Sequence, residues 1–288
     1  MSDRVGAFGL HVRSEVPLPL DGDDPTDADG NVDVVEGGVH FPPGQDGDVA
    51  SREGDVFLRV DGVGAFRIGT DSVIVDRVDG VVDGVPARAI LGRVLAILLY
   101  RRGYAVMHGS AAAIDGRGVA LVGFKGSGKS SLAAGLYARG HAPVTDDIVV
   151  VRLGDRPSLV PSFPRMKLDE RTLATLGLID GARETDRKQW YAVDDRFERN
   201  PVPLDTVFVL EERDVDGPTV DALEPATAME RLLRHSASAE LVEATETEER
   251  HFRECAQVAD AADVKRLYRP DDLSQLPELA RTVENALE

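Results

Sequence analysis

Eight consecutive residues have the types and spacing of a phosphate-binding loop. Residues 123–130 read GFKGSGKS and satisfy the pattern G-x-x-x-x-G-K-[ST]. Its glycines let backbone N–H groups approach phosphate oxygens, and the following helix adds about half an elementary charge at its N-terminus. The lysine of the pattern reaches the β- and γ-phosphates, and the next hydroxyl binds Mg²⁺. We therefore predict an ATP and Mg²⁺ site, with Ser130 as a metal ligand, at Gly123, Phe124, Lys125, Gly126, Ser127, Gly128, Lys129, Ser130 and Ser131.

The surrounding sequence supports this prediction. The apolar run VALV at 119–122 leads into the loop, and SLAAGLYA at 131–138 has helical composition. Most basic residues of the chain are arginine, and two of its few lysines fall inside the loop. The alternative is a chance match in a Gly- and Ser-rich surface loop. All five lysines are Lys125, Lys129, Lys167, Lys188 and Lys265.

An acidic pair and a histidine flank the loop in the sequence. Asp146 and Asp147 follow the short run 142–144, and one helix and one strand fill the gap back to Lys129. Such a gap can return the pair to the phosphates, where one carboxylate can hold Mg²⁺ and the other can accept a proton from an attacking hydroxyl. A solvated Asp-Asp turn is the alternative. His108 precedes Gly123 by 15 residues, and this spacing alone favours a structural histidine.

The elements that must position these residues alternate between strand and helix. The runs VMHGSAAAID (106–115) and RGVALVG (117–123) predict two strands, and HAPVTDDIVVV and PLDTVFVLEE predict further ones. TAMERLLRHS and SQLPELARTVENAL predict helices. Strand, glycine-rich turn, helix and strand in this order indicate an α/β fold.

The N-terminal part has a different character. Short alternating runs before and after the Asp-, Gly- and Pro-rich stretch 21–55 predict a small antiparallel sheet, with 21–55 as turns and loops. Ile90, Val94 and Ile97 recur at helical spacing and predict a buried helix. We therefore predict a β-rich domain over 1–85 and a P-loop domain over 86–288.

Composition excludes several classes of function. The chain has 33 Lys and Arg against 51 Asp and Glu, a net charge of −18, which argues against binding to nucleic acid or to an anionic membrane. One cysteine, Cys255, excludes a disulfide framework, and the histidines lack zinc-ligand spacing. Without an apolar run of about 20 residues or a signal segment, we expect a cytoplasmic protein. The acidic excess and the few lysines are typical of halophilic organisms; an acidic surface for a basic partner is the alternative.

The segment MHGSAAAIDGRGVALVGFKGSGKSSLAAGLYARGHAPVTDDIVVV resembles the catalytic core of HPr kinase/phosphorylase and its HprK-related relatives. The likeness consists of a histidine, a Gly-containing hairpin, the P-loop, a helix ending in R-G-H, and the acidic pair. AFGLHVRSEVPLPL and FPRMKL extend it loosely to the wider HprK-related group. The resemblance implies an α/β (overall α+β) fold with an HPr-kinase-like, PEP-carboxykinase-like core, and makes self-association plausible.

The resemblance also implies roles for single residues. Asp146 matches the general base, His108 the histidine that assists it, and Lys129 the phosphate lysine. Asp147 and Ser130 match the metal-binding positions. Arg165 and Lys188 are candidate cationic clamps on the transferred phosphoryl group, with ordinary surface cations as the alternative.

The expected function is ATP-dependent phosphorylation of a hydroxyl, first of all a serine of a protein or peptide. A kinase for a small molecule such as free serine, and a nucleotide-binding regulatory protein with little catalysis, are the alternatives. The family's later glycine-Arg-Asn loop has no good match, because the nearest string, RNPVP at 199–203, lacks the glycine. The resemblance therefore does not extend to phosphorylase activity or to HPr itself as acceptor.

Overall fold

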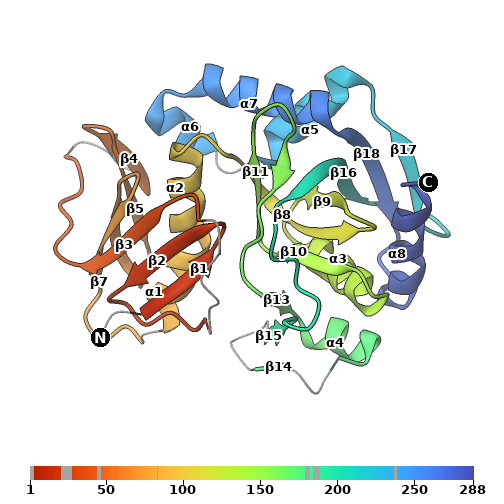
Figure 1. The fold of residues 1–288 in the computed structure, drawn as a ribbon, viewed down its shortest axis with the longest axis horizontal. Helices are drawn as coiled ribbons and strands as arrows, with labels where there is room; N and C mark the ends of the chain where they lie inside the picture. The colour runs from red at the N-terminus through yellow and green to blue at the C-terminus, as the bar shows by residue number, and fades with distance from the viewer. Residues whose placement is uncertain are drawn as a thin grey trace. The chain divides into compact units, whose positions relative to one another are not determined.

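The computed structural model describes residues 3–20, 28–43, 47–82, 84–178, 182–183, 189–236 and 239–288 (Figure 1). The chain forms two compact units. The N-terminal unit comprises Met1–Val106 and Ala237–Phe252, and the P-loop unit comprises Met107–Ser236 and Arg253–Glu288. This division differs from the predicted boundary between residues 85 and 86.

Packing explains why the N-terminal unit extends beyond residue 85. Helix α2 (Leu95–Arg101) buries all of its residues from Leu95 to Tyr100, and Arg101 Nη1 donates a hydrogen bond to the Ile68 carbonyl of the same unit. Helix α6 (Ala239–Thr245) returns to pack against strand β4 (Val49–Arg52). The predicted helix around Ile90 is confirmed: α1 (Gly84–Ala89), a π-helical turn (Ile90–Val94) and α2 follow one another, with non-helical torsions at Gly92.

The sheet of the N-terminal unit has seven strands in the order β1-β2-β3-β7-β6-β5-β4. The prediction of an antiparallel sheet is wrong in part, because β3 pairs in parallel with both β2 and β7. The stretch 21–55 also contains two strands, since Val32 and Val34 of β3 alternate toward the core within their Asp- and Gly-rich surroundings. The remaining strands are β1 (Asp3–Ala7), β2 (Leu10–Ser14), β3 (Asn31–Glu36), β5 (Asp55–Val60), β6 (Gly64–Ile68) and β7 (Ser72–Arg77).

The P-loop unit is built on an eight-stranded mixed sheet, in which β10, β8, β9, β16, β18 and β17 each pair with the next. The predicted hairpin is confirmed, because β8 and β9 are antiparallel and turn at Asp115-Gly116, both with positive φ. A separate small sheet has the order β13-β15-β14. The strands of this unit are β8 (Ala105–Ile114), β9 (Arg117–Gly123), β10 (Ala142–Thr145), β11 (Ile148–Arg152), β12 (Ser158–Leu159), β13 (Arg165–Leu168), β14 (Ala182–Arg183), β15 (Gln189–Ala192), β16 (Val202–Glu212), β17 (Thr219–Ala222) and β18 (Asp263–Arg269).

Helix α3 (Lys129–Ala138) follows the P-loop and lies at the centre of the unit's core. It packs against α8 (Leu276–Asn285), α4 (Glu170–Leu176) and strands β9, β10 and β13. Leu132, Leu136 and Phe208 of the shared core are fully buried. Helix α5 (Pro225–His235) begins with proline at its first turn, and α7 (Glu248–Ala261) runs from one unit into the other. The predicted helices after residues 129, 225 and 274 are therefore confirmed.

The strand directions bring distant residues to one edge of the sheet. Strand β16 is parallel to β9 and to β18, so the carboxyl ends of all three strands meet there, with Leu210 opposite Gly123 and Glu212 opposite Arg269. Strand β8 runs the other way, and its Gly109 lies opposite Val122. His108 therefore lies beside the start of the P-loop, and the sheet gathers the chemistry at this edge.

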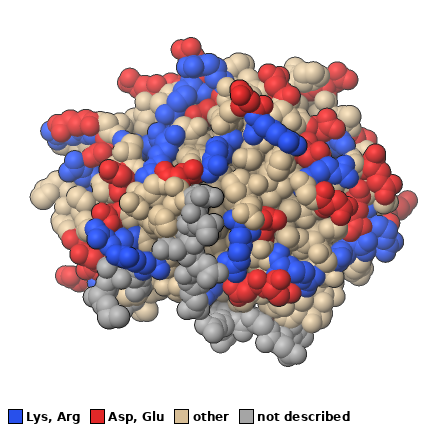
Figure 2. Space-filling model, in the orientation of Figure 1, with Lys and Arg blue, Asp and Glu red and all other residues tan. Residues whose placement is uncertain are grey.

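Acidic and basic side chains are interspersed on the face of the molecule in Figure 2. The described residues on that face form no broad basic surface, in keeping with the net charge of −18. Within the described part of the chain, no helix combines the length and apolar character needed to cross a membrane.

Candidate functional site

The P-loop has a backbone that only glycine adopts easily. Gly123, Gly126 and Gly128 have φ values of 154°, 88° and 88°. A Cβ on Gly123 would lie 2.7 Å from Ser127 Oγ and 2.9 Å from the Leu210 carbonyl oxygen, so that position also lacks space for a side chain. Gly128 is the N-cap of α3, and the glycines of the motif thus set the turn that aims the helix N-terminus at the loop.

Lys129 is buried beneath the loop. Its Nζ donates hydrogen bonds of 2.8 Å to the carbonyl oxygens of Gly123 and Phe124. The Ser127 hydroxyl is also buried, and within the described residues it has no hydrogen-bond partner. A buried hydroxyl without a partner costs stability unless a ligand satisfies it, and an anion in the loop would attract both the hydroxyl and the ammonium.

Arg269, at the end of β18, braces the loop from the other side. Its Nε donates to the Ser127 carbonyl at 2.6 Å, and its Nη2 donates to the Gly126 carbonyl at 3.3 Å. Nη2 also pairs with Glu212 at 2.9 Å, and the side chain is only 12% exposed. Three acceptors on one planar guanidinium fix the loop backbone more firmly than a single contact would.

The two neighbouring aspartates have different surroundings. Asp146 is buried; its Oδ1 accepts a hydrogen bond from Ser110 Oγ at 2.7 Å, and its Oδ2 accepts one from the Lys167 backbone N–H at 2.8 Å. Strand β10 ends beside β8, with Thr145 paired to Ala111, which carries the pair to the P-loop edge. Asp146 is therefore held in one orientation.

Asp147 is more exposed and lies in a sharp turn. Its φ of 77° is in the left-handed region, which Asp tolerates better than most side chains. The carboxylate is 39% exposed, and Oδ2 pairs with Lys167 Nζ at 2.6 Å. Lys167 also lies over the ring of Trp190, 5.0 Å from its centroid. The Asp147 carboxylate thus faces solvent with a lysine on one side.

His108 is fixed by the backbone of Asp147. Its Nδ1 lies 2.9 Å from the Asp147 carbonyl oxygen and 3.8 Å from Oδ1 of the same residue. Because a carbonyl only accepts hydrogen bonds, Nδ1 carries the proton, and Nε2 of the neutral ring keeps its lone pair. Burial and then the charge of Lys129 lower the pKa of His108, and Asp147 opposes this shift. The ring is therefore neutral at pH 7.

A second histidine lies beside the loop. His235, the last residue of α5, is buried and meets the exposed ring of Phe124 edge to face, with centroids 4.8 Å apart. Burial and then the charge of Lys129 lower the pKa of His235 to about 4. His235 thus supports the loop as a neutral ring.

Oxygen donors at this edge suit a small hard cation. Ser130 is the second residue of α3 and supplies a hydroxyl, and Asp146 and Asp147 supply carboxylates. The described residues contain no cluster of three or more His, Cys, Asp or Glu side chains that could hold a metal by themselves. Mg²⁺ commonly uses one or two protein ligands and completes its shell with phosphates and water, so this donor set fits Mg²⁺ bound together with a nucleotide.

The structure brings the P-loop, the acidic pair and His108 together at one edge of the sheet, and four further predicted residues lie as follows. The Ser131 hydroxyl bonds to Thr172 Oγ1 of α4 at 2.9 Å, so it helps dock α3 on α4. Arg165 lies on β13 two residues before Lys167, on the same face of the strand. Lys188 lies outside the described residues. Lys125 is exposed on the loop.

Sequence reasoning missed four residues of the site: Ser110, Lys167, His235 and Arg269. One signal could have found Lys167, since lysine is rare in this chain and two other lysines already mark the P-loop. No local pattern marks Arg269 or His235, which reach the loop only through the pairing of β18 with β16 and the end of α5.

Comparisons with known proteins agree on the family of this region. Residues 103–185 match the model of the HPr Serine kinase C-terminal domain. The HPr kinase/phosphorylase of Chlorobaculum tepidum is 41% identical over 78 residues, which are 27% of this chain and 23% of that protein. The HPr kinase/phosphorylase of Bacillus pumilus is 39% identical over 74 residues, which are 26% of this chain and 24% of that protein.

These matches span about a quarter of the length of the curated relatives. A solved structure of the Hpr(Ser) kinase/phosphatase from Coxiella burnetii is 16% identical, covers 63% of this chain and 89% of its own, and has a TM-score of 0.34. The matched segment contains His108, the P-loop, the acidic pair and Lys167. Residues 103–185 are therefore similar to the HPr Serine kinase C-terminal domain, and this similarity covers less than a third of the chain.

Proposed function

We propose that this protein transfers the γ-phosphoryl group of ATP to a hydroxyl, with a serine of a protein or peptide as the acceptor. The arrangement of His108 carries the proposal. The Asp147 carbonyl fixes Nδ1–H, Nε2 keeps a lone pair, the Asp147 carboxylate lies beside the ring, and Lys129 is near enough to depress the pKa. Binding a nucleotide requires none of the proton-accepting groups, whereas transfer to a hydroxyl uses them.

The P-loop and its neighbours hold the phosphates. Backbone N–H groups at the start of α3 and the Lys129 ammonium neutralise the β- and γ-phosphates once Lys129 exchanges its carbonyl acceptors for phosphate oxygens. Mg²⁺ held near Ser130 and Asp146 would supply further positive charge for these phosphates. Arg269 keeps the loop carbonyls of Gly126 and Ser127 turned toward β18 and away from the anion.

The geometry favours an exchange of the two roles that the family resemblance implies for the aspartates. Asp147 pairs with the Lys167 ammonium, a poor neighbour for a divalent cation, and has its exposed carboxylate beside His108. Asp146 is buried and immobilised by Ser110 and the Lys167 amide, and each carboxylate oxygen keeps a second lone pair. We therefore assign the metal-facing role to Asp146 with Ser130, and the proton-accepting role to Asp147.

With these roles, the transfer step forms one bond, breaks one bond and moves one proton. The acceptor oxygen forms a bond to the γ-phosphorus, the bond from this phosphorus to the bridging oxygen breaks, and ADP leaves. The acceptor proton passes to the Asp147 carboxylate. His108 Nε2 accepts a hydrogen bond from the incoming hydroxyl and orients it, because its lone pair is the free one. Lys167 holds the Asp147 carboxylate in place.

The names of the relatives point to a protein acceptor, HPr, and to a second activity, phosphorylase. For this chain we propose only the kinase direction and a serine hydroxyl. A kinase for free serine or a similar small molecule, and a regulatory protein that binds nucleotide with little catalysis, are the alternatives that the test must separate. Self-association, a cytoplasmic location and a halophilic origin stay predictions.

The test follows labelled phosphate. Purified protein is incubated with Mg²⁺ and ATP carrying a γ-phosphorus label, and with HPr, a pool of serine peptides or free serine as acceptor. We expect transfer to a protein or peptide serine, and a loss of at least about a hundredfold in Lys129→Ala. Lys265→Ala is the control, since Lys265 pairs with Asp263 at the opposite edge of the sheet.

Each alternative has its own result. Label in free serine and none in HPr or peptides would replace the protein acceptor by a small molecule. Binding of Mg·ATP that Lys129→Ala abolishes, without transfer to any acceptor, would support the regulatory protein. Turnover by Lys129→Ala equal to that of the parent would contradict the assignment of the loop.

A further inference from the structure

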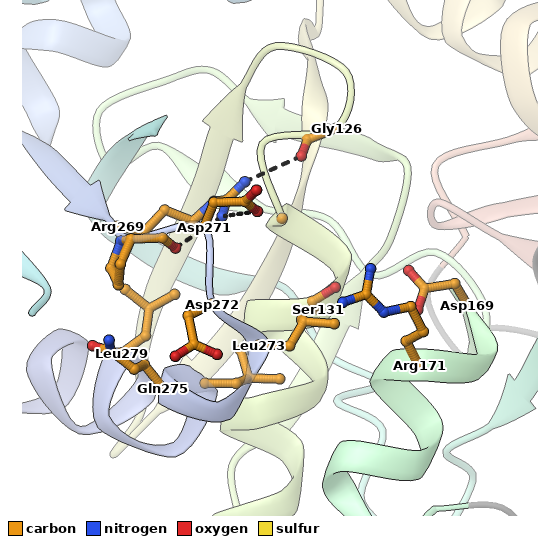
Figure 3. Close-up of a pocket in the computed structure, with 13 residues that line it drawn as sticks. Gly126, Ser131, Asp169, Arg171, Arg269, Asp271, Asp272, Leu273, Gln275 and Leu279 are labelled. Carbon is orange, nitrogen blue, oxygen red and sulfur yellow. Dashed lines mark hydrogen bonds and ion pairs between the residues drawn. The ribbon is translucent and has the colours of Figure 1, made fainter. Parts of the chain in front are cut away.

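A pocket opens on the β18 side of the P-loop (Figure 3). Gly126, Gly128 and Ser131 form its wall toward the loop. The segment after β18 and the start of α8 form the opposite wall, and the start of α4 closes a third side. The cavity volume is about 260 Å³, slightly below the range of about 300–1,000 Å³ that is typical of ligand pockets. This volume suits one nucleoside-sized group.

The order of the strands decides which part of a nucleotide reaches this pocket. From the acidic pair, the order runs β10, β8, β9, β16, β18. The P-loop follows β9 in the middle; Asp147 and His108 lie on the β10 and β8 side, and the pocket lies on the β18 side. A nucleotide whose γ-phosphate faces Asp147 therefore extends the rest of its chain toward the pocket.

The pocket's lining has the chemistry of a nucleoside site. Pro270, Leu273, Leu276 and Leu279 supply apolar surface against which a planar base can pack. Leu276 and Leu279 are buried and belong to the core, so that surface is rigid, whereas Leu273 is half-buried and borders the cavity. Ligand sites typically combine such apolar surface with a few polar groups at the rim.

The rim carries charges that do not oppose an anionic ligand. Asp272 uses its carboxylate to accept from the backbone N–H and the hydroxyl of Ser274, at 2.9 and 2.8 Å. Asp271 lies 3.7 Å from Arg269 Nη1. Arg171 lies beside Ser131 at the other rim, and among the described residues its guanidinium has no ion-pair partner. Asp169, also at this rim, accepts a hydrogen bond from the Thr172 backbone N–H at 2.8 Å, so each carboxylate of the lining already has a donor or a cation beside it.

We propose that this pocket binds the base and ribose of the nucleotide whose phosphates occupy the P-loop, with Leu273 packed against the base. This inference rests on the proposed function. The phosphates are held by the loop and Lys129, and the nucleoside is held separately by the surface between Pro270 and Leu279. Substitutions in the two places consequently change the binding of different parts of the same ligand.

The experiment compares Mg·ATP with Mg·tripolyphosphate by calorimetry, because tripolyphosphate has the phosphates and lacks the nucleoside. Leu273→Gln removes apolar surface at a half-buried position without adding charge. We expect the dissociation constant of Mg·ATP to rise about tenfold, which corresponds to about 1.4 kcal/mol, and that of Mg·tripolyphosphate to stay unchanged. Leu223→Gln is the matched control, since Leu223 is also half-buried and bonds to Val264 at the far end of β18.

The possible results separate the two proposals. Equal losses for both ligands, or no loss for either in Leu273→Gln, would overturn the nucleoside pocket and leave the P-loop assignment standing. The same follows if the parent protein binds tripolyphosphate as tightly as ATP. If the parent binds neither ligand, the proposed function fails and the pocket assignment fails with it.

Discussion

On the β8 and β10 side of the P-loop, titratable side chains lie close together, whereas on the β18 side apolar side chains line a pocket. The first side holds His108, Asp146, Asp147 and Lys167, linked by hydrogen bonds and ion pairs. The second side is built from leucines of α8 and its preceding turn; of its charged groups, Asp272 bonds to Ser274 and Asp271 lies near Arg269. Arg269 separates the two by fixing the loop between them.

This difference implies that the two sides contribute different steps. Proton acceptance needs groups whose charge and hydrogen bonds are set by their neighbours, and the first side has them. Recognition of a base needs shape and apolar area, and the second side has these. Apart from Asp146, which we assign to Mg²⁺, substitutions on the first side should therefore change the rate of transfer, and those on the second side the affinity.

The largest effect is expected from the aspartate pair. Asp147→Asn removes the proposed proton acceptor while keeping its size, so transfer should slow at least about a hundredfold with Mg·ATP affinity close to that of the parent. Asp146→Asn should instead weaken Mg·ATP binding, and added Mg²⁺ should partly restore it. Single-turnover transfer and calorimetric binding measure the two quantities.

The same variants decide between the two assignments of the pair. A pure rate defect in Asp146→Asn and a binding defect in Asp147→Asn would return the base to Asp146, as the family resemblance implies. Asn at 146 keeps the Lys167 contact only if its amide oxygen accepts from that N–H and its NH₂ donates to the Ser110 hydroxyl, so the melting temperature of this variant must be measured too. Ser110→Ala is a milder second variant, because it removes one contact to Asp146 and keeps its charge.

Sequence predicts the parts of this site that are local in the chain. The P-loop, its strand and its helix are contiguous, so their residue types carry the full pattern, and β9 and α3 lie where expected. The hairpin at Asp115-Gly116 likewise needs only two turn residues. Local sequence patterns therefore predict the P-loop part of the site.

The other half depends on tertiary contacts. Arg269 lies 140 residues after Lys129 and meets the loop only because β18 pairs in parallel with β16. The roles of Asp146 and Asp147 could not be read from their order, because burial and the position of Lys167 distinguish them. The strands within 21–55 were missed for a similar reason, since pairing with two neighbours outweighs an Asp- and Gly-rich composition.

A smaller effect, on affinity alone, is expected from Arg269, which holds the P-loop between the two sides. Arg269→Ala removes the donors to the Gly126 and Ser127 carbonyls and leaves the loop less ordered, so Mg·ATP and Mg·tripolyphosphate should both bind about tenfold more weakly. Arg281→Ala, which breaks an exposed pair with Glu278, should change neither. A loss for ATP only would place Arg269 in the nucleoside pocket, and no loss would show that the loop needs no brace.

The smallest effect concerns the charge of His108. Burial and Lys129 lower its pKa, so the ring stays neutral from pH 8 down past its ordinary pKa of about 6.5, and Nε2 keeps its lone pair over this range. The single-turnover rate should therefore fall only at lower pH, where protonation removes the acceptor and adds a cation beside Lys129. His108→Gln should slow transfer by about tenfold or less, because the proposed role of His108 is to orient the hydroxyl and not to accept its proton. The pH profile of this variant should lose the fall in rate at low pH.

His40→Gln, at an exposed position in the N-terminal unit, is the control and should keep the parent profile. An acid limb that persists unchanged in His108→Gln would assign the titration to another group and remove His108 from the transfer step.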